Sequence, residues 1–457
     1  MHTRTQQLLV VLTACCLASI GLLAVPTVAM AATAYTVSTT ADVAANAGAC
    51  GNSAITTAPV PLSLREATCL ANNAGGAVTI SVPAGTYNLS NGELRPGTHT
   101  GQSVTIIGAG AASTVVSGQG LSRVLDIDPN SLGGVDAALS GLTITGGSDS
   151  TFGGAGILAG AGNATTSDLL SLDSMVIAGN AADVASPGST NQNGGGLEFQ
   201  GGKLTVTNTT FSNNTAHSSQ GSGLFYQATG TSSPEGLTVT GSTFSANSAT
   251  NTNGSPVNNG GALALQGGTT FAVSGSRFVN NTSVATTGSS VGAAIWAQGG
   301  TLSVNSSTFT GNSVSGAGSP SGGAIYTAAT ALTAHYDRFV GNSAATGSAI
   351  FEASGSVDAT DDWWGCNTGP GTAGCDTVAG GPLVSPRLVL SVTASPATVV
   401  GPNATSTVTA ALTSDSLGGA IGGANLGAFE ALPVSFSDPP GDATVTDPSE
   451  QLVAGQA

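Results

Sequence analysis

The sequence predicts an all-β fold, a right-handed parallel β-helix, from two observations. The first is composition: the 457 residues include 67 glycines, and only 7% are charged and 4% aromatic, whereas about 25% of residues are charged in an ordinary soluble domain. The second is an internal repeat of 30 to 34 residues in which apolar and polar positions alternate. A chain with so few long charged side chains lacks material for helix surfaces, so stacked strands are expected.

The charge balance and the apolar content exclude two classes of protein. The chain has 8 Lys and Arg residues against 24 Asp and Glu residues, a formal net charge of −16. A nucleic-acid partner would need clustered basic side chains over its phosphates, so none is predicted. The hydrophobic content of 40% argues against intrinsic disorder, which requires low hydrophobicity and high charge.

Residues 1–31 are predicted to be a signal peptide. Arg4 precedes an apolar stretch at residues 8–25, and residues 29–31 form an A-x-A cleavage signature. One alternative is a transmembrane anchor, although no basic stop-transfer flank follows; another is a lipid anchor at residues 12–15. We therefore expect a bacterial secreted or cell-surface protein without a membrane span in the mature chain.

Four cysteines remain after this cleavage, and they fall into two local pairs. Cys50 pairs with Cys69, and Cys366 pairs with Cys375, as expected for disulfides in an oxidising compartment. A zinc site would need convergent ligands, and neither a C-x-x-C motif nor His-rich spacing is present. Two disulfides are predicted, with no metal site and no cofactor.

The repeat itself predicts the β-helix. Each of six units contains an apolar-x-apolar pair, a large apolar residue five positions later and an asparagine three positions further on, for example Leu204, Val206, Phe211 and Asn214. Period two indicates strands, and stacking the units at ~4.8 Å per coil buries their apolar faces. Parallel crossovers are almost always right-handed. The asparagines are predicted to stack as a structural ladder at one corner: Asn180, Asn214, Asn247, Asn281, Asn312 and Asn342.

Several motifs resemble those of bacterial β-helix surface proteins. The Gly-Gly-Ala-Ile element at 322–325 and the Phe-x-x-Asn elements resemble repeats of the polymorphic outer-membrane protein family, over about residues 154–342. The Ser-Leu-Arg-Glu-Ala element at 63–67 resembles one found near the start of many secreted β-helix proteins, and residues 361–365 resemble a common closing motif. The resemblance implies the fold, secretion and a surface or adhesive role; it implies no reaction.

We divide the chain into a signal peptide (1–31), an N-terminal cap (32–77), a parallel β-helix (78–386) and a partial immunoglobulin-like module (387–457). Ser63 and Glu66 form a capping-box pattern that predicts a short helix over the first coil. Trp363 and Trp364 are expected to cover the last coil, although paired tryptophans also suit a sugar-binding surface. The alternating strands from residue 388 resemble a bacterial immunoglobulin-like β-sandwich, but such a module uses roughly 100 residues.

Three aromatic residues are the candidate ligand-binding residues. Trp296, Tyr326 and Phe351 each follow the aliphatic residue of a glycine-rich run, at positions expected to face outward. They are predicted to form an exposed aromatic ladder that stacks on sugar rings. The alternative is that a neighbouring loop or the C-terminal module covers them.

An extracellular enzyme is the alternative to a binding protein, because the chain has candidates for the groups that such enzymes use. A glycosidase needs two carboxylates, and a lyase needs a basic proton acceptor. Asp126 and Asp128 share one face of a predicted strand and are the catalytic candidates. No acidic column accompanies the basic residues, which are also explained as solvated surface charge. The basic candidates are Lys203, His217, Arg277, His335 and Arg338.

The predicted function is therefore that of a monomeric, secreted or cell-surface scaffold with an adhesive role. Its expected ligands are carbohydrate or another cell-surface molecule. The alternative is an extracellular polysaccharide lyase or glycoside hydrolase.

Overall fold

The residues placed by the computed structural model form most of the chain from residue 33 onward. They are 33–43, 57–151, 153–160, 166–182, 193–217, 220–230, 233–251, 257–286, 288–401, 403–437, 444–445 and 449–457. The predicted signal peptide and Cys50 lie outside the described residues, so the Cys50–Cys69 pairing stays a prediction. In the described ranges, no helix has the length and apolar character needed to cross a bilayer.

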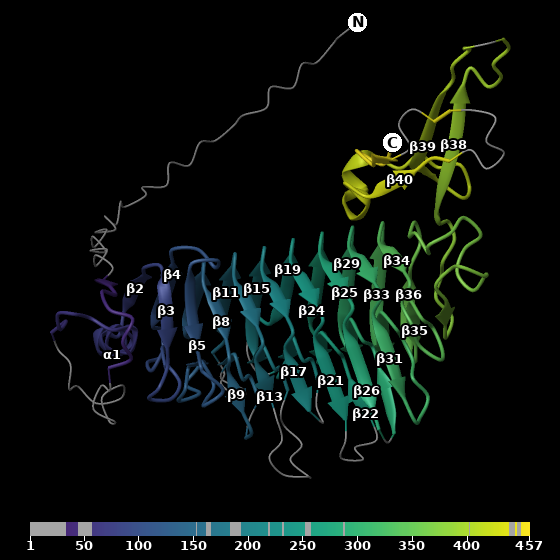
Figure 1. Cartoon of the computed structure of the whole chain (residues 1–457). Coiled ribbons are helices and arrows are strands. Elements are labelled where there is room, and N and C mark those ends of the chain that lie inside the picture. Colours follow the sequence, from purple (N-terminus) through teal and green to yellow (C-terminus); the bar gives the residue numbers. More distant parts are fainter. Residues whose placement is uncertain are drawn as a thin grey trace, which may run out of the picture. The chain divides into compact units, whose positions relative to one another are not determined.

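The predicted all-β parallel solenoid is confirmed (Figure 1). Sheet 1 contains β1 (Thr33–Thr36), β2 (Ala77–Val82), β4 (Ser103–Gly108), β7 (Asp136–Ser140), β11 (Asp168–Asp173), β15 (Gly202–Thr207), β19 (Gly236–Thr240), β24 (Thr270–Ser274), β29 (Thr301–Asn305), β33 (Thr330–His335) and β36 (Gly355–Asp358). Sheet 2 contains β3 (Gly85–Asn88), β5 (Thr114–Ser117), β8 (Thr143–Thr145), β12 (Val176–Ala178), β16 (Thr210–Ser212), β20 (Thr243–Ser245), β25 (Arg277–Val279), β30 (Thr308–Thr310) and β34 (Arg338–Val340).

Two further parallel sheets complete the coils. Sheet 3 contains β6 (Leu125–Ile127), β10 (Ile157–Ala159), β14 (Leu197–Gln200), β18 (Leu224–Gln227), β23 (Leu263–Gln266), β28 (Ile295–Gln298), β32 (Ile325–Ala328), β35 (Ile350–Glu352) and β37 (Val378–Ala379). Sheet 4 contains β9 (Ser148–Asp149), β13 (Ala181–Ala182), β17 (Thr215–His217), β21 (Ser248–Asn251), β26 (Thr282–Ala285) and β31 (Ser313–Gly316). β22 (Val257–Asn259) and β27 (Ser289–Val291) form a separate parallel pair.

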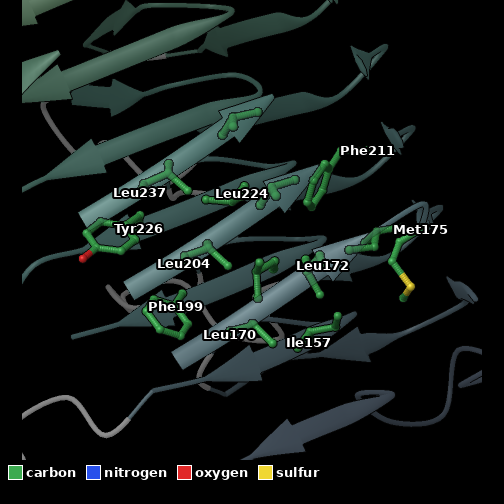
Figure 2. Close-up of a cluster of buried hydrophobic side chains, with 14 of the residues drawn as sticks. Ile157, Leu170, Leu172, Met175, Phe199, Leu204, Phe211, Leu224, Tyr226 and Leu237 are labelled. Atoms are coloured by element: carbon green, nitrogen blue, oxygen red, sulfur yellow. The ribbon is translucent and has the colours of Figure 1, made fainter. Parts of the chain in front are cut away.

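Alternation along each strand produces the core. In β15, Leu204 and Val206 are fully buried while the intervening Thr205 is only partly buried. Register aligns Leu170, Leu204 and Leu237 in consecutive coils, and Figure 2 shows their side chains inside the solenoid. On the inner face of sheet 2 the phenylalanine rings stack in parallel with centroids 4.8–5.0 Å apart. These rings belong to Phe211, Phe244, Phe278, Phe309 and Phe339.

The six repeated asparagines form a buried column. The Oδ1 of Asn247 accepts hydrogen bonds from the backbone N–H (3.1 Å) and the side-chain amide (3.0 Å) of Asn214 in the preceding coil. Its own Nδ2 donates to the carbonyl oxygen of Phe211 at 3.0 Å. The same pattern continues to Asn342, where Asp376 replaces the next asparagine. The column satisfies backbone groups that the corner would otherwise bury without partners.

A second polar column lies at the corner before sheet 2. Ser242 Oγ accepts the backbone N–H of Thr209 in the preceding coil at 3.1 Å, and later coils repeat the bond. The last two members are Asp337 and Asp362, which are fully buried. Burial raises the pKa of both carboxyls well above the usual range.

The two ends differ in structure. At the start, α1 (Leu64–Ala74) has both hydrogen bonds of the predicted capping box, and its Leu70 packs into the main core. At the other end, Trp364 is fully buried and stacks on Phe339, with ring centroids 5.0 Å apart. The predicted Cys366–Cys375 disulfide is present, with a Cα–Cα distance of 5.4 Å.

The segment from residue 388 contains two antiparallel two-stranded sheets. β38 (Leu388–Ser395) pairs with β39 (Thr407–Asp415), and β40 (Pro433–Ser435) pairs with β41 (Ser449–Gln451). Short 3₁₀ helices cover Gly423–Asn425 and Gly427–Phe429. The segment has its own buried cluster, which includes Leu412 and Phe429. Its assignment to the immunoglobulin-like fold stays a prediction.

Candidate binding cleft

A polar cleft of about 880 Å³ lies on the outer face of sheet 3 near β6, β10 and β14. We call it the carboxylate cleft, because five carboxylates line it together with two guanidiniums and several amides. The carboxylates are Glu93, Asp126, Asp128, Asp149 and Glu198; the guanidiniums are Arg95 and Arg123; the amides include Asn193, Gln200 and Gln227.

Strand register brings the central residues together. Asp126 of β6 pairs with Leu158 of β10, which pairs with Glu198 of β14, so the three form one column. Leu94 bridges Leu125, which puts Arg95 beside Asp126 in the preceding coil. Because neighbouring strands lie ~4.8 Å apart, the Cα atoms of Asp126 and Glu198 are about 9.6 Å apart.

Arg123 organises the cleft. Its side chain is only 5% exposed and forms ion pairs with Glu93 at 2.9 Å and Asp149 at 3.2 Å. The guanidinium also donates to the carbonyl oxygens of Gly153 and Gly154. It therefore joins the chain before β6 to the segment that contains Glu93, 30 residues earlier, and to β9 with the loop that follows it. Removing it would leave buried acceptors without a donor.

Two carboxyls of the central column have raised pKa values. Burial, followed by the negative charge of Glu93, raises the pKa of Asp126 to about 6, although Arg123 and Arg95 oppose the shift. Arg95 lies 3.4 Å from the Asp126 carboxylate and 3.7 Å from that of Glu93. Burial raises the pKa of Glu198 to about 8. The site therefore combines one carboxyl that is largely ionised at neutral pH with one that is largely protonated.

Glu198 is also the group with unused hydrogen-bonding capacity. It is 1% exposed, and its Oε1 accepts a hydrogen bond from the side-chain amide of Gln200. Its buried Oε2 has no hydrogen-bond partner among the described residues. A buried polar atom without a partner is uncommon in native structures, so Oε2 is a group that a ligand could satisfy.

Asp126 and Asp128, the catalytic candidates from the sequence, both line the cleft. Asp128 accepts hydrogen bonds from the backbone N–H groups of Leu132 (3.1 Å) and Gly133 (2.8 Å), which hold the turn after β6. Burial raises its pKa despite these bonds. Asp126, by contrast, lies 3.4 Å from the Arg95 guanidinium and is acted on by the charges of Glu93 and Arg123.

The aromatic ladder is exposed only in part. Trp296, Tyr326 and Phe351 are aligned in β28, β32 and β35, and the Tyr326 and Phe351 rings stack with centroids 5.4 Å apart. The expectation that Trp296 is exposed is wrong: it is 4% exposed and packs with Phe225 and Val291. The reason is the extra strand β27, whose Val291 contacts the Trp296 cluster.

The basic candidates do not join the cleft. Arg277, Thr308 and Arg338 align on sheet 2, as their equivalent positions in the repeat indicated. His335 lies 3.6 Å from Asp358 at the end of sheet 1. Lys203 and His217 belong to sheets 1 and 4, and the residues lining the cleft include none of these five.

Sequence reasoning missed most of the cleft. Glu93, Arg95 and Arg123 precede the six regular repeats and lie at corners, where no spacing marks them. Glu198 follows a glycine-rich run, at a position expected to face outward. In the other repeats this position holds an uncharged residue, so the charge of Glu198 was the one signal in the sequence for a site here. In the described residues, no group of three or more His, Cys, Asp or Glu side chains could hold a metal ion.

No protein-family model, curated protein or solved structure matches this chain. The function of the cleft is therefore inferred from its own geometry and charge.

Proposed function

We propose that this chain is a secreted or cell-surface protein that binds carbohydrate through the carboxylate cleft. The observation that carries the proposal is a large polar cleft on a regular sheet, lined by carboxylates, amides and guanidiniums. Sugar hydroxyls donate and accept hydrogen bonds, and these side chains supply both partners. Secretion, removal of residues 1–31 and a monomeric, adhesive scaffold belong to the same proposal.

The size and rigidity of the cleft support this function. Small-molecule sites typically enclose about 300–1,000 Å³, and the 880 Å³ here falls within that range. The central column of the cleft stands on paired strands, and the ion pairs of Arg123 with Glu93 and Asp149 hold the adjoining segments, so less ordering is needed on binding. Leu158 and Pro129 provide limited apolar surface, which is consistent with recognition mainly through hydrogen bonds.

A column of glutamines supplies a matched test of binding. Gln200, Gln227, Gln266 and Gln298 stand in register on sheet 3, but only Gln200 and Gln227 line the cleft. The purified protein should bind members of an array of plant, fungal and bacterial glycans. Gln227→Ala should weaken this binding about tenfold, as expected for loss of a good hydrogen bond, whereas Gln298→Ala should not change it. Equal effects of both variants would contradict binding at the cleft.

A glycoside hydrolase is the second candidate, and the Asp126–Glu198 column favours it. The two residues stand two coils apart in one column, and an inverting glycosidase needs its two carboxyl groups on facing sides of the substrate, about 6.5–9.5 Å apart. Protonated Glu198 would donate its proton to the glycosidic oxygen as that bond breaks. Ionised Asp126 would accept a proton from the water that attacks the anomeric carbon.

Reducing-end release separates the two candidates. Neutral and acidic polysaccharides are incubated with the protein, and new reducing ends are measured alongside binding. Release that Asp126→Asn abolishes would establish the hydrolase, because this variant keeps the shape but cannot accept the proton. Binding without release would leave carbohydrate binding as the function.

A further inference from the structure

The carboxylate cleft carries an excess of negative charge. Five carboxylates and two guanidiniums line it, and with Glu198 protonated near neutral pH its formal charge is −2. The whole chain has a net charge of −16, and a field of one sign attracts ligands of opposite charge and repels those of like charge. The ligand that fits must therefore tolerate a negative site.

The two guanidiniums are already paired. Arg123 contacts Glu93 and Asp149 and is almost fully buried, so a ligand cannot approach it without displacing those carboxylates. Arg95 is half-exposed and lies between Asp126 and Glu93. Among the residues that line the cleft, each cation thus already has two anionic partners. An incoming carboxylate or sulfate would compete with them and meet the remaining negative charge.

The unused hydrogen-bonding capacity of the cleft lies at Glu198, whose carboxyl donates one hydrogen bond when protonated and only accepts when ionised. Oε2 of Glu198 is buried without a partner among the described residues. A primary ammonium group carries three N–H donors and a positive charge, and its bonds to carboxylates are stronger than neutral hydrogen bonds.

We propose that the cleft selects glycans whose sugars carry a free, protonated amine and discriminates against glycans rich in uronate or sulfate. This inference rests on the proposed function and specifies its ligand class. The amine would bind against Glu198, between Gln200 and Asp126. The sugar hydroxyls would then bind Gln227 and Asn193.

Binding should release a proton. The charged groups that act on Glu198 are Arg123 and Asp149, and Gln200 is its hydrogen-bond donor. Burial keeps this carboxyl protonated in the empty cleft near neutral pH. An adjacent ammonium favours the ionised carboxylate, so an amine should expel the proton on binding, whereas a neutral sugar should not.

Three tetrasaccharides with the same β-1,4 linkage test the inference: tetramers of glucose, glucosamine and glucuronic acid. Calorimetric titration at about pH 6, where a weakly basic amine is charged, should give an affinity for the glucosamine tetramer at least about tenfold higher than for the glucose tetramer. The glucuronic acid tetramer should bind more weakly than the glucose tetramer. Salt should reduce the advantage of glucosamine, because screening weakens charge interactions. Titration in buffers of different ionisation enthalpy should show proton release with the glucosamine tetramer only.

Two variants localise the effect. Glu198→Gln keeps the size and the hydrogen bonding of the protonated acid, so it should fold, and it should reduce the ratio of glucosamine to glucose affinity toward one. Gln298→Ala, outside the cleft, should leave the ratio unchanged. Equal affinity for glucose and glucosamine, or a preference for glucuronic acid, would overturn the selectivity while the proposed function stands. Failure of all three tetramers and of the glycan array to bind would overturn both.

Discussion

The outer face of sheet 3 divides into two halves that share one backbone. In β6, β10 and β14 the outward column carries Asp126, Leu158 and Glu198 and opens into a polar cleft. From β18 onward the same column is apolar, and Trp296 is buried. The strands are paired in the same way in both halves, so strand geometry does not account for the difference.

The segments at the corners of the coils account for the difference between the polar and the apolar half. At the N-terminal half, corner residues bring Arg123 and Glu93 to the carboxylates and leave space above the column. Toward the C-terminal half, the β22–β27 pair is added beside the coils, and Val291 packs on Trp296. The comparison teaches that a repeated strand position acquires its role from the corner beside it.

The most damaging change should be Arg123→Ala in the polar half. Removing one partner of a buried ion pair costs about 3–5 kcal/mol, and two carbonyl oxygens also lose their donor. Urea denaturation should show this loss, and glycan binding should disappear with it. Arg95→Ala, at the half-exposed guanidinium, is the control and should cost less than about 1 kcal/mol. Similar losses for the two arginines would argue against Arg123 as the organiser.

Trp296→Ala should destabilise the apolar half without affecting ligands. Truncation of a buried tryptophan costs about 3–5 kcal/mol, measured by the same denaturation. Glycan affinity should stay within twofold of the wild type, since Trp296 does not line the cleft. Loss of binding with a small loss of stability would restore the sugar-binding role predicted for this residue.

Glu198 should make the polar half sensitive to pH. Its pKa is about 8 in the folded protein against an ordinary value of 4.5 for a glutamate, so the folded state binds more protons than the unfolded state between these values. The free energy of unfolding should therefore fall as the pH rises from about 5 to 8. The difference should be about 2–4 kcal/mol, since one pKa unit corresponds to about 1.4 kcal/mol.

The Glu198→Gln variant isolates this contribution. Other buried carboxyls, including Asp337 and Asp362, contribute in the same direction in both proteins. The pH profile of the variant should therefore be flatter than that of the wild type. Parallel profiles would show that Glu198 is ionised over the whole range.

Tyr326→Ala should have the smallest effect. Its ring stacks on Phe351 and is only partly buried, and such aromatic pairs are worth about 0.5–1.5 kcal/mol. Thermal denaturation measures this loss, and the glycan array measures binding. Reduced binding would place a second ligand surface on the apolar half and remove the functional distinction between the two.

The repeat made much of the fold predictable. Leu204, Val206 and Phe211 alternate with polar residues in a spacing that recurs in every unit, so period alone identified the strands and their inward faces. The asparagine column and the disulfide at Cys366 also carry clear local signals. The cleft lacked such a signal, because Arg123 and Glu93 are 30 residues apart and each is an isolated charge at a corner.

The sequence by itself determined the coils, because an apolar face that repeats at fixed intervals can be buried only by stacking one unit on the next. Tertiary structure alone decided which outward residues meet a neighbouring corner. Asp126 and Glu198 acquire their raised pKa values from burial under those corners, and Trp296 loses its exposure in the same way. Burial and charge pairing depend on distances between coils, and spacing along one chain does not specify them.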